Sequence, residues 1–159
     1  MALAERTGAA LLRQGRMLAT AESCTGGGVA HALTAVAGSS GWFERGFVTY
    51  SNEAKREMLG VRPETLQTFG AVSEATVREM AEGALRHSRA QVSLSISGIA
   101  GPSGGSADKP VGMVCFGWAM QGRPTRTRTE YFSGDRAQVR EQAVRWALEG
   151  LLDVLDQPV

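Results

Sequence analysis

Residues 16–38 restrict the fold of this chain more than any other segment. A short apolar run at 16–21 leads into the glycine-rich segment Glu22-Ser23-Cys24-Thr25-Gly26-Gly27-Gly28, and a helical pattern follows that stops at Gly38. This order predicts a strand, a tight turn and a helix. A strand that runs directly into a helix is typical of layered α/β domains, so we expect a sheet covered by helices.

The rest of the chain continues this alternation of extended and helical patterns. Apolar residues at helical spacing predict helices over 3–14, 52–59 and 73–87 and a last helix after residue 135, with Gly15, Ser73 and Asp135 as end residues. Extended patterns predict strands at 47–50, 92–99, 111–120 and 126–132. The last two strands form a hairpin, which places at least one antiparallel strand in an otherwise parallel sheet.

Composition limits the class of protein. The length of 159 residues corresponds to a single domain over residues 1–159. Seventeen basic and sixteen acidic residues give a net charge of +1, which provides no basic stripe for nucleic acid. Apolar runs stay short of the ~20 residues that span a bilayer, and the first residues lack the pattern of a signal peptide. We therefore expect a cytoplasmic protein without a nucleic-acid or membrane partner, in which Cys24 and Cys115 are free thiols.

Ser23 is the first candidate for catalysis because it follows the first predicted strand. Ligands of open α/β sheets bind at the carboxyl ends of the strands. Backbone N–H groups of Thr25, Gly26 and Gly27, and those of the next helix N-terminus, would stabilise an oxyanion there. Ser23 is therefore a candidate nucleophile, unless Ser23 or Thr25 only caps the helix. Cys24 is a second candidate, although neither histidine of the chain is placed to activate it.

Lysine is rare in this chain, and this draws attention to Lys55. Lys55 and Lys109 are the only lysines among the seventeen basic residues. Lysine, unlike arginine, can act as a base when burial lowers its pKa. Tyr50 ends a predicted strand and Lys55 follows on a helical turn, so both can reach the sheet edge that carries Ser23. Lys55 is a candidate base and Tyr50 a candidate proton relay or substrate contact. The alternative is a packed Tyr50 and a solvated Lys55.

Two further segments are candidates for binding an anion. Gly101, Gly104 and Gly105 lie in a long turn, where glycines allow backbone N–H groups to approach a phosphate. Their spacing matches neither the dinucleotide fingerprint nor the P-loop, so a flexible loop is the alternative. Arg136 and Arg140 either meet an anion or lie at the surface. No His-x-x-x-His, Cys-x-x-Cys or carboxylate cluster appears, so we expect chemistry without a metal ion or cofactor.

Six motifs, spread over nearly the whole chain, carry a family resemblance. They are Ala21-Glu22-Ser23-Cys24-Thr25-Gly26-Gly27, Gly46-Phe47-Val48-Thr49-Tyr50-Ser51-Asn52-Glu53-Ala54-Lys55, Gly70-Ala71-Val72-Ser73, Ser97-Gly98-Ile99-Ala100-Gly101-Pro102, Lys109-Pro110-Val111-Gly112 and Phe132-Ser133-Gly134-Asp135-Arg136. In content and order they resemble the CinA C-terminal domain family, the nicotinamide-nucleotide amidases. The resemblance implies a three-layer α/β/α sandwich with a mixed, mostly parallel sheet of about five strands. It places the family's serine, tyrosine and lysine on Ser23, Tyr50 and Lys55.

The resemblance also implies a reaction, the hydrolysis of the carboxamide of nicotinamide mononucleotide to nicotinic acid mononucleotide and ammonia. We expect Lys55, with Tyr50 as relay, to remove the Ser23 proton, and the substrate phosphate to lie against residues 101–105 or Arg140. The alternatives are a non-catalytic nucleotide-binding regulatory module and an amidase for another carboxamide. We also expect a homo-oligomer, and a stand-alone form without the larger N-terminal domain of full CinA proteins.

Overall fold

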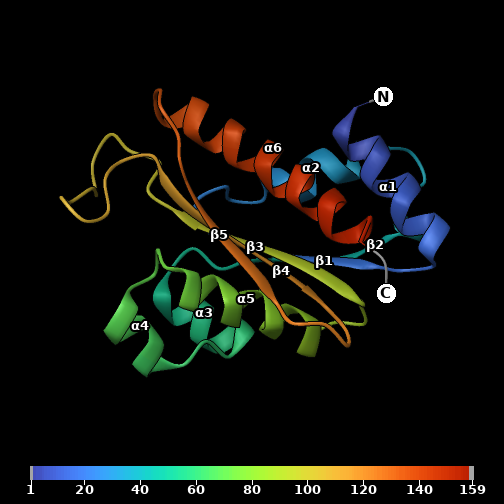
Figure 1. Cartoon of the computed structure of the whole chain (residues 1–159), viewed down its shortest axis with the longest axis horizontal. Coiled ribbons are helices and arrows are strands. Elements are labelled where there is room, and N and C mark those ends of the chain that lie inside the picture. Colours follow the sequence, from blue (N-terminus) through green and yellow to red (C-terminus); the bar gives the residue numbers. More distant parts are fainter. Residues whose placement is uncertain (1, 158–159) are drawn as a thin grey trace.

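The computed structural model describes residues 2–157 and shows a five-stranded sheet between two layers of helices (Figure 1). The helices are α1 (Leu3–Gln14), α2 (Gly28–Thr34), α3 (Asn52–Leu59), α4 (Pro63–Phe69), α5 (Glu74–Arg86) and α6 (Arg136–Leu155), with a 3₁₀ turn at Ser39–Gly41. The strands are β1 (Leu18–Glu22), β2 (Phe43–Val48), β3 (Val92–Gly98), β4 (Met113–Met120) and β5 (Arg126–Tyr131). The predicted three-layer α/β/α fold is thus confirmed.

The direction of the strands brings the candidate residues together. The sheet has the order β2-β1-β3-β4-β5, and β1 is parallel to both of its neighbours. β4 is antiparallel to β3 and β5, so it alone of the described strands runs in the opposite direction. The segments that follow Glu22, Val48 and Gly98 therefore leave the sheet at one edge, where ligands bind in such folds.

Each face of the sheet packs against its own layer of helices. Figure 1 shows α1, α2 and α6 on one face and α3, α4 and α5 on the other. On β3, the apolar residues of one face enter the hydrophobic cluster shared with α1, α2 and α6. Ser93 and Ser95 on the other face are buried, and each donates a 2.6 Å hydrogen bond to a carbonyl oxygen of α5. These hydroxyls are satisfied, so the strand can be buried on both sides.

The helix ends follow the predicted signals. Ser73 accepts a hydrogen bond from the N–H of Thr76 at the start of α5. Asp135 and Gln138 form a reciprocal capping box at the start of α6, and Gly15 ends α1 with a φ of 64°. A left-handed residue at this position satisfies the last carbonyl groups of the helix. No helix within residues 2–157 has the length and apolar character needed to cross a membrane.

Two elements differ from the sequence-based expectation. β2 begins at Phe43 rather than at residue 47, because it is an edge strand whose exposed residues, among them Arg45 and Gly46, give no apolar pattern. The sequence does not predict α4, which has seven residues and buries only Thr65. Such a short helix depends on tertiary contacts rather than on its own hydrophobic stripe.

Gly83 allows α5 to pack against the end of α3, the helix that carries Lys55. A Cβ atom at position 83 would lie 2.0 Å from the carbonyl oxygen of Leu59. We expect Gly83→Ala to lower the free energy of unfolding by about 1–3 kcal/mol because the backbone must move, although alanine favours the helix by about 1 kcal/mol. Urea denaturation measures the change. Gly41→Ala, whose Cβ would meet only Leu12 at 3.6 Å, is the control. A Gly83→Ala protein more stable than the wild type would contradict this packing.

Candidate active site

Ser23 is the first residue after β1, and the chain turns sharply at this point. Its N–H donates a 3.0 Å hydrogen bond to the carbonyl oxygen of Ile96 in β3, and its own carbonyl accepts one of 3.0 Å from Gly26. The residue is only 7% exposed. Its Oγ atom accepts a 3.1 Å hydrogen bond from Nζ of Lys55. The structure therefore brings together the predicted nucleophile and the predicted base.

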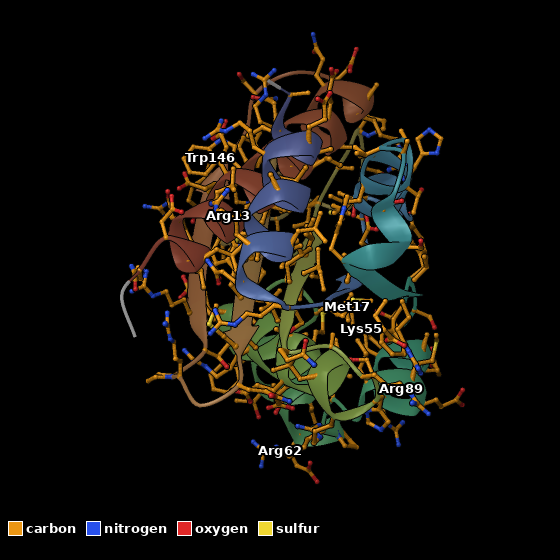
Figure 2. All side chains as sticks on the ribbon, turned by 90° about the vertical axis from the view of Figure 1, so that its right-hand side faces the viewer. Arg13, Met17, Lys55, Arg62, Arg89 and Trp146 are labelled. Atoms are coloured by element: carbon orange, nitrogen blue, oxygen red, sulfur yellow. The ribbon has the colours of Figure 1, made fainter. Side chains whose placement is uncertain are left out.

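The amino group of Lys55 is buried between α3 and the edge of the sheet. Figure 2 labels Lys55 together with Arg62 and Arg89, which in contrast are exposed. Lys55 is 1% exposed, and Nζ also donates a 3.1 Å hydrogen bond to the carbonyl oxygen of Thr49. Within residues 2–157 no carboxylate forms an ion pair with it. Burial therefore lowers the pKa of Lys55, because desolvation penalises the charged form.

Cys24 adjoins Ser23 but belongs to the hydrophobic cluster that α6 covers. Burial raises the pKa of its thiol to about 11, so the thiol stays protonated at neutral pH. His31 and His87 are both exposed, and neither has a hydrogen bond to Cys24 within the described chain. The same residues contain no group of His, Cys, Asp and Glu side chains that could hold a metal ion. The surroundings favour Ser23 over Cys24 as nucleophile.

Tyr50 lies at the surface of the site and is 62% exposed. Its hydroxyl accepts a 3.0 Å hydrogen bond from Arg136 in the first turn of α6. Arg136 also donates a 2.8 Å hydrogen bond to the carbonyl oxygen of Gly101. Between residues 2 and 157 the Tyr50 hydroxyl makes no hydrogen bond to Ser23 or Lys55. Arg136 thus joins the segment after β2 to the loop after β3, with Tyr50 as one of its partners.

Arg140 lies one turn further along α6 and contacts the turn after Ser23. Its Nε donates a 3.1 Å hydrogen bond to the carbonyl oxygen of Cys24, and Nη2 donates one of 3.4 Å to that of Thr25. Neither Arg140 nor Arg136 is paired with a carboxylate in the described part of the chain. The two guanidinium groups give this end of the sheet positive charge that an anionic ligand would balance.

Glu22 is a buried carboxylate that sequence reasoning does not single out. It accepts hydrogen bonds from the hydroxyl of Thr25 at 2.6 Å and from the N–H groups of Val29 and Ala30 at 2.9 and 3.1 Å. The N–H groups at the start of α2, which the sequence suggested for an anion, are therefore already occupied. A carboxylate at the end of an otherwise uncharged buried strand is the signal that could have revealed this role.

The backbone donors of the turn are only partly engaged. The N–H of Gly26 donates to the carbonyl oxygen of Ser23, whereas those of Thr25 and Gly27 have no acceptor among residues 2–157. Gly26 and Gly27 have φ values of 56° and 100°, a region that glycine adopts at little cost. Two of the three predicted donors are thus without an acceptor in the described part of the chain.

The loop between β3 and β4 extends beyond the sheet at the left of Figure 1. A Cβ at Gly101 would lie 2.5 Å from Cγ1 of Val111, and one at Gly105 would lie 2.7 Å from the Val111 nitrogen. Packing within the loop therefore explains these two glycines, while Gly104 has a φ of 95° and ordinary contacts. The amino group of Lys109 donates to the last carbonyl of α4 and ties the loop to that helix.

Comparison with known proteins finds relatives over almost the whole chain. The model of the CinA C-terminal domain matches residues 1–155. The nicotinamide-nucleotide amidohydrolase PncC of Escherichia coli (strain K12) is 60% identical over 151 residues, which are 95% of this chain and 92% of that protein. A CinA-like protein of Chlorobium phaeobacteroides is 54% identical over 142 residues, 87% of this chain but 34% of that longer protein. The crystal structure of competence/damage inducible protein CihA from Agrobacterium tumefaciens has a TM-score of 0.93 and 50% identity, covering 98% of this chain and 94% of the other.

The lowered pKa of Lys55 makes the stability of the fold depend on pH. In the unfolded chain a lysine titrates near ~10.4, whereas in the fold Lys55 releases its proton at a lower pH. Between these two pKa values the unfolded state binds more protons, so the free energy of unfolding rises with pH in this window. We expect Lys55→Met to lack this rise, which urea denaturation of both proteins at several pH values would show. A stability difference between them that stays constant up to about pH 10 would contradict the lowered pKa.

Proposed function

Since the chain belongs to the CinA C-terminal domain family and is 60% identical to the nicotinamide-nucleotide amidohydrolase PncC of Escherichia coli, we propose that it converts nicotinamide mononucleotide and water to nicotinic acid mononucleotide and ammonia. Ser23 is the nucleophile and Lys55 the general base in this proposal. The observation that carries it is the 3.1 Å hydrogen bond between Lys55 Nζ and Ser23 Oγ, made where both residues are buried. A nucleophile hydrogen-bonded to a base whose pKa is lowered by burial is typical of covalent catalysis.

The surroundings of Lys55 suit a neutral amine. A neutral amino group has two N–H bonds and one lone pair. It can donate to the carbonyl oxygen of Thr49 and, at the distance seen, accept the hydroxyl proton of Ser23. A carboxylate next to Lys55 would favour the charged ammonium form, and the described residues place none in contact with it. The site therefore supports proton transfer from Ser23 to Lys55.

The proposed reaction has two stages. As Lys55 Nζ takes the proton, Ser23 Oγ bonds to the carboxamide carbon, whose carbonyl oxygen becomes an oxyanion. The C–N bond then breaks, and the nitrogen leaves as ammonia with the proton returned by Lys55. Water, deprotonated by Lys55, next attacks the resulting ester. Cleavage of that ester gives the carboxylate product and returns the hydroxyl of Ser23.

We assign the oxyanion contacts to the turn after Ser23 and a further role near the substrate to Tyr50. The N–H groups of Thr25 and Gly27 have no acceptor within residues 2–157, which supports them as oxyanion donors. Gly26 supplies the conformation of the turn instead, because its own N–H is engaged. Tyr50 stays a candidate substrate contact or proton relay, since its hydroxyl accepts a hydrogen bond from Arg136 and its own O–H can still donate.

The substrate phosphate is proposed to bind near α6. Arg136 and Arg140 lie on successive turns of this helix, and their hydrogen-bond partners in the described chain are uncharged. A phosphate dianion is the natural partner of two such guanidinium groups. The backbone of residues 101–105 borders this position through the hydrogen bond from Arg136 to Gly101. Gly104 and Gly105 remain candidates to approach the phosphate.

Release of ammonia from nicotinamide mononucleotide tests the proposed activity. We expect ammonia and nicotinic acid mononucleotide in equal amounts, and a higher kcat/KM than with nicotinamide riboside or free nicotinamide, which lack the phosphate. Binding of the nucleotide without release of ammonia would instead indicate a regulatory module. Equal kcat/KM values with and without the ribose phosphate would indicate an amidase for another carboxamide.

Two neighbouring substitutions test the choice of nucleophile. Ser23→Ala should abolish ammonia release and leave binding of the nucleotide largely intact, because it removes the attacking oxygen and little contact area. Cys24→Ala should keep most of the activity, since the thiol is buried and protonated. Calorimetric titration of the Ser23→Ala protein with the nucleotide measures whether binding is kept. An inactive Cys24→Ala together with an active Ser23→Ala would move the nucleophile to Cys24.

Two substitutions at Lys55 separate a base from a positive charge. Arginine keeps the charge but has no accessible neutral form. We therefore expect Lys55→Arg to lower kcat by about 10²–10⁴, the contribution of a positioned general base. Lys55→Met should show a loss of similar size, measured at saturating substrate with folding checked by circular dichroism. Near wild-type turnover in the arginine variant, with loss only in the methionine variant, would make Lys55 an electrostatic group.

A further inference from the structure

Glu22 and Thr25 form a hydrogen-bonded pair within the turn that carries Ser23. Both residues are 1% exposed, and their side chains are 2.6 Å apart. The same carboxylate accepts the N–H groups of Val29 and Ala30 in the first turn of α2. Glu22 is thus bonded at once to the middle of the turn and to the helix that follows it.

The chemistry of these contacts requires a carboxylate. A buried charge is costly unless it is fully hydrogen-bonded, and here three donors meet the two oxygens of Glu22. Within residues 2–157 no lysine or arginine forms an ion pair with it. A glutamine at this position would turn an NH₂ group toward one of the donors, so at least one hydrogen bond would be lost.

The rest of the turn has few other side-chain anchors. Gly26 and Gly27 have no side chains, and Cys24 packs into the hydrophobic cluster. The hydroxyl of Thr25 is therefore the one polar side chain by which the middle of the described turn is held. Arg140 holds the opposite side of the turn through two carbonyl oxygens. The free N–H groups lie on Thr25 itself and on Gly27, between Thr25 and α2.

We propose that Glu22 is a positioning residue, which acts through Thr25 and α2 to aim the N–H groups of Thr25 and Gly27 at the oxyanion. The inference rests on the proposed function, and it names the residue that holds the oxyanion donors in position for the transition state of that reaction. Such donors work only when they already point to where the charge develops. A displacement of about 1 Å can cost about 100-fold in rate. Loss of Glu22 should therefore affect the transition state more than the bound substrate.

The chain offers a matched control for a purely structural role. Glu79 accepts hydrogen bonds from the hydroxyl of Thr65 and the N–H of Arg62 at the start of α4. This pair has the same hydroxyl-to-carboxylate hydrogen bond as Glu22 and Thr25 but lies at a different helix, where Glu79 also forms a 3.5 Å ion pair with Arg62. Glu79→Gln should lower stability and leave kcat unchanged.

Steady-state kinetics of ammonia release, with thermal unfolding of each variant, provide the test. We expect Glu22→Gln and Thr25→Val each to lower kcat by about 10–100-fold, with KM changed by less than about twofold. Their combination should cost little more than either alone, because both break one hydrogen-bonded unit. Thr25→Ser, which keeps the hydroxyl, should retain most of the wild-type kcat. Unchanged kcat in Glu22→Gln, or a rise in KM without a fall in kcat, would overturn the inference.

A second readout separates this inference from the proposed substrate. A fluorophosphonate reacts with an activated serine: serine Oγ bonds to phosphorus, the P–F bond breaks and fluoride leaves. Negative charge develops on the phosphoryl oxygen in the transition state, where the oxyanion of the amide would form. We expect it to label Ser23 at least about 10-fold more slowly in Glu22→Gln than in Glu79→Gln. If the wild type releases no ammonia, the proposed function fails and the labelling rates alone decide. Equal labelling rates in these two variants would overturn the role of Glu22.

Discussion

The burial of one amino group, that of Lys55, is the constraint on which the site depends. An ammonium ion in this position has no carboxylate partner among the described residues, and only Ser23 Oγ and the Thr49 carbonyl accept its hydrogen bonds. Desolvation therefore shifts Lys55 toward the neutral form that a base requires. The helix that carries Lys55, α3, packs on α5, where Gly83 leaves room for the backbone at Leu59.

The site also depends on the parallel strands, which bring segments that are far apart in the sequence to the same edge of the sheet. β1, β2 and β3 end at the same sheet edge, so the turn after Glu22 and the segment after Val48 face one another. Helix α6 connects the segments that follow β1, β2 and β3. Arg136 bonds to the Tyr50 hydroxyl and to the Gly101 carbonyl oxygen, and Arg140 bonds to two carbonyl oxygens of the turn after β1. Lys55 lies on α3, and Arg136 and Arg140 lie on α6, so helices hold these three side chains in place. The glycine-rich turn remains free to present its N–H groups to a ligand.

Much of this could be predicted from the sequence, for reasons that particular residues make clear. The alternation of patterns predicts the α/β layers, and residues at strand ends meet in parallel sheets, which is why Ser23 and Lys55 could be paired in advance. The partners of Arg136 could not be predicted from the sequence, since Tyr50 and Gly101 lie 86 and 35 positions away from it. Glu22 was missed because its role depends on which backbone donors surround it. The homo-oligomeric state and the place of the phosphate stay predictions.

The central claim, that Lys55 is neutral enough to act as a base, can be measured directly. With only two lysines in the chain, ¹³C-lysine labelling gives two Cε signals, and Lys55→Met assigns them. The account predicts that the Lys55 signal titrates at a pH clearly below the ~10.4 of a free lysine. It also predicts that Ser23→Ala leaves this lowered value in place, because burial is its cause. A Lys55 signal that titrates near ~10.4 would contradict the account.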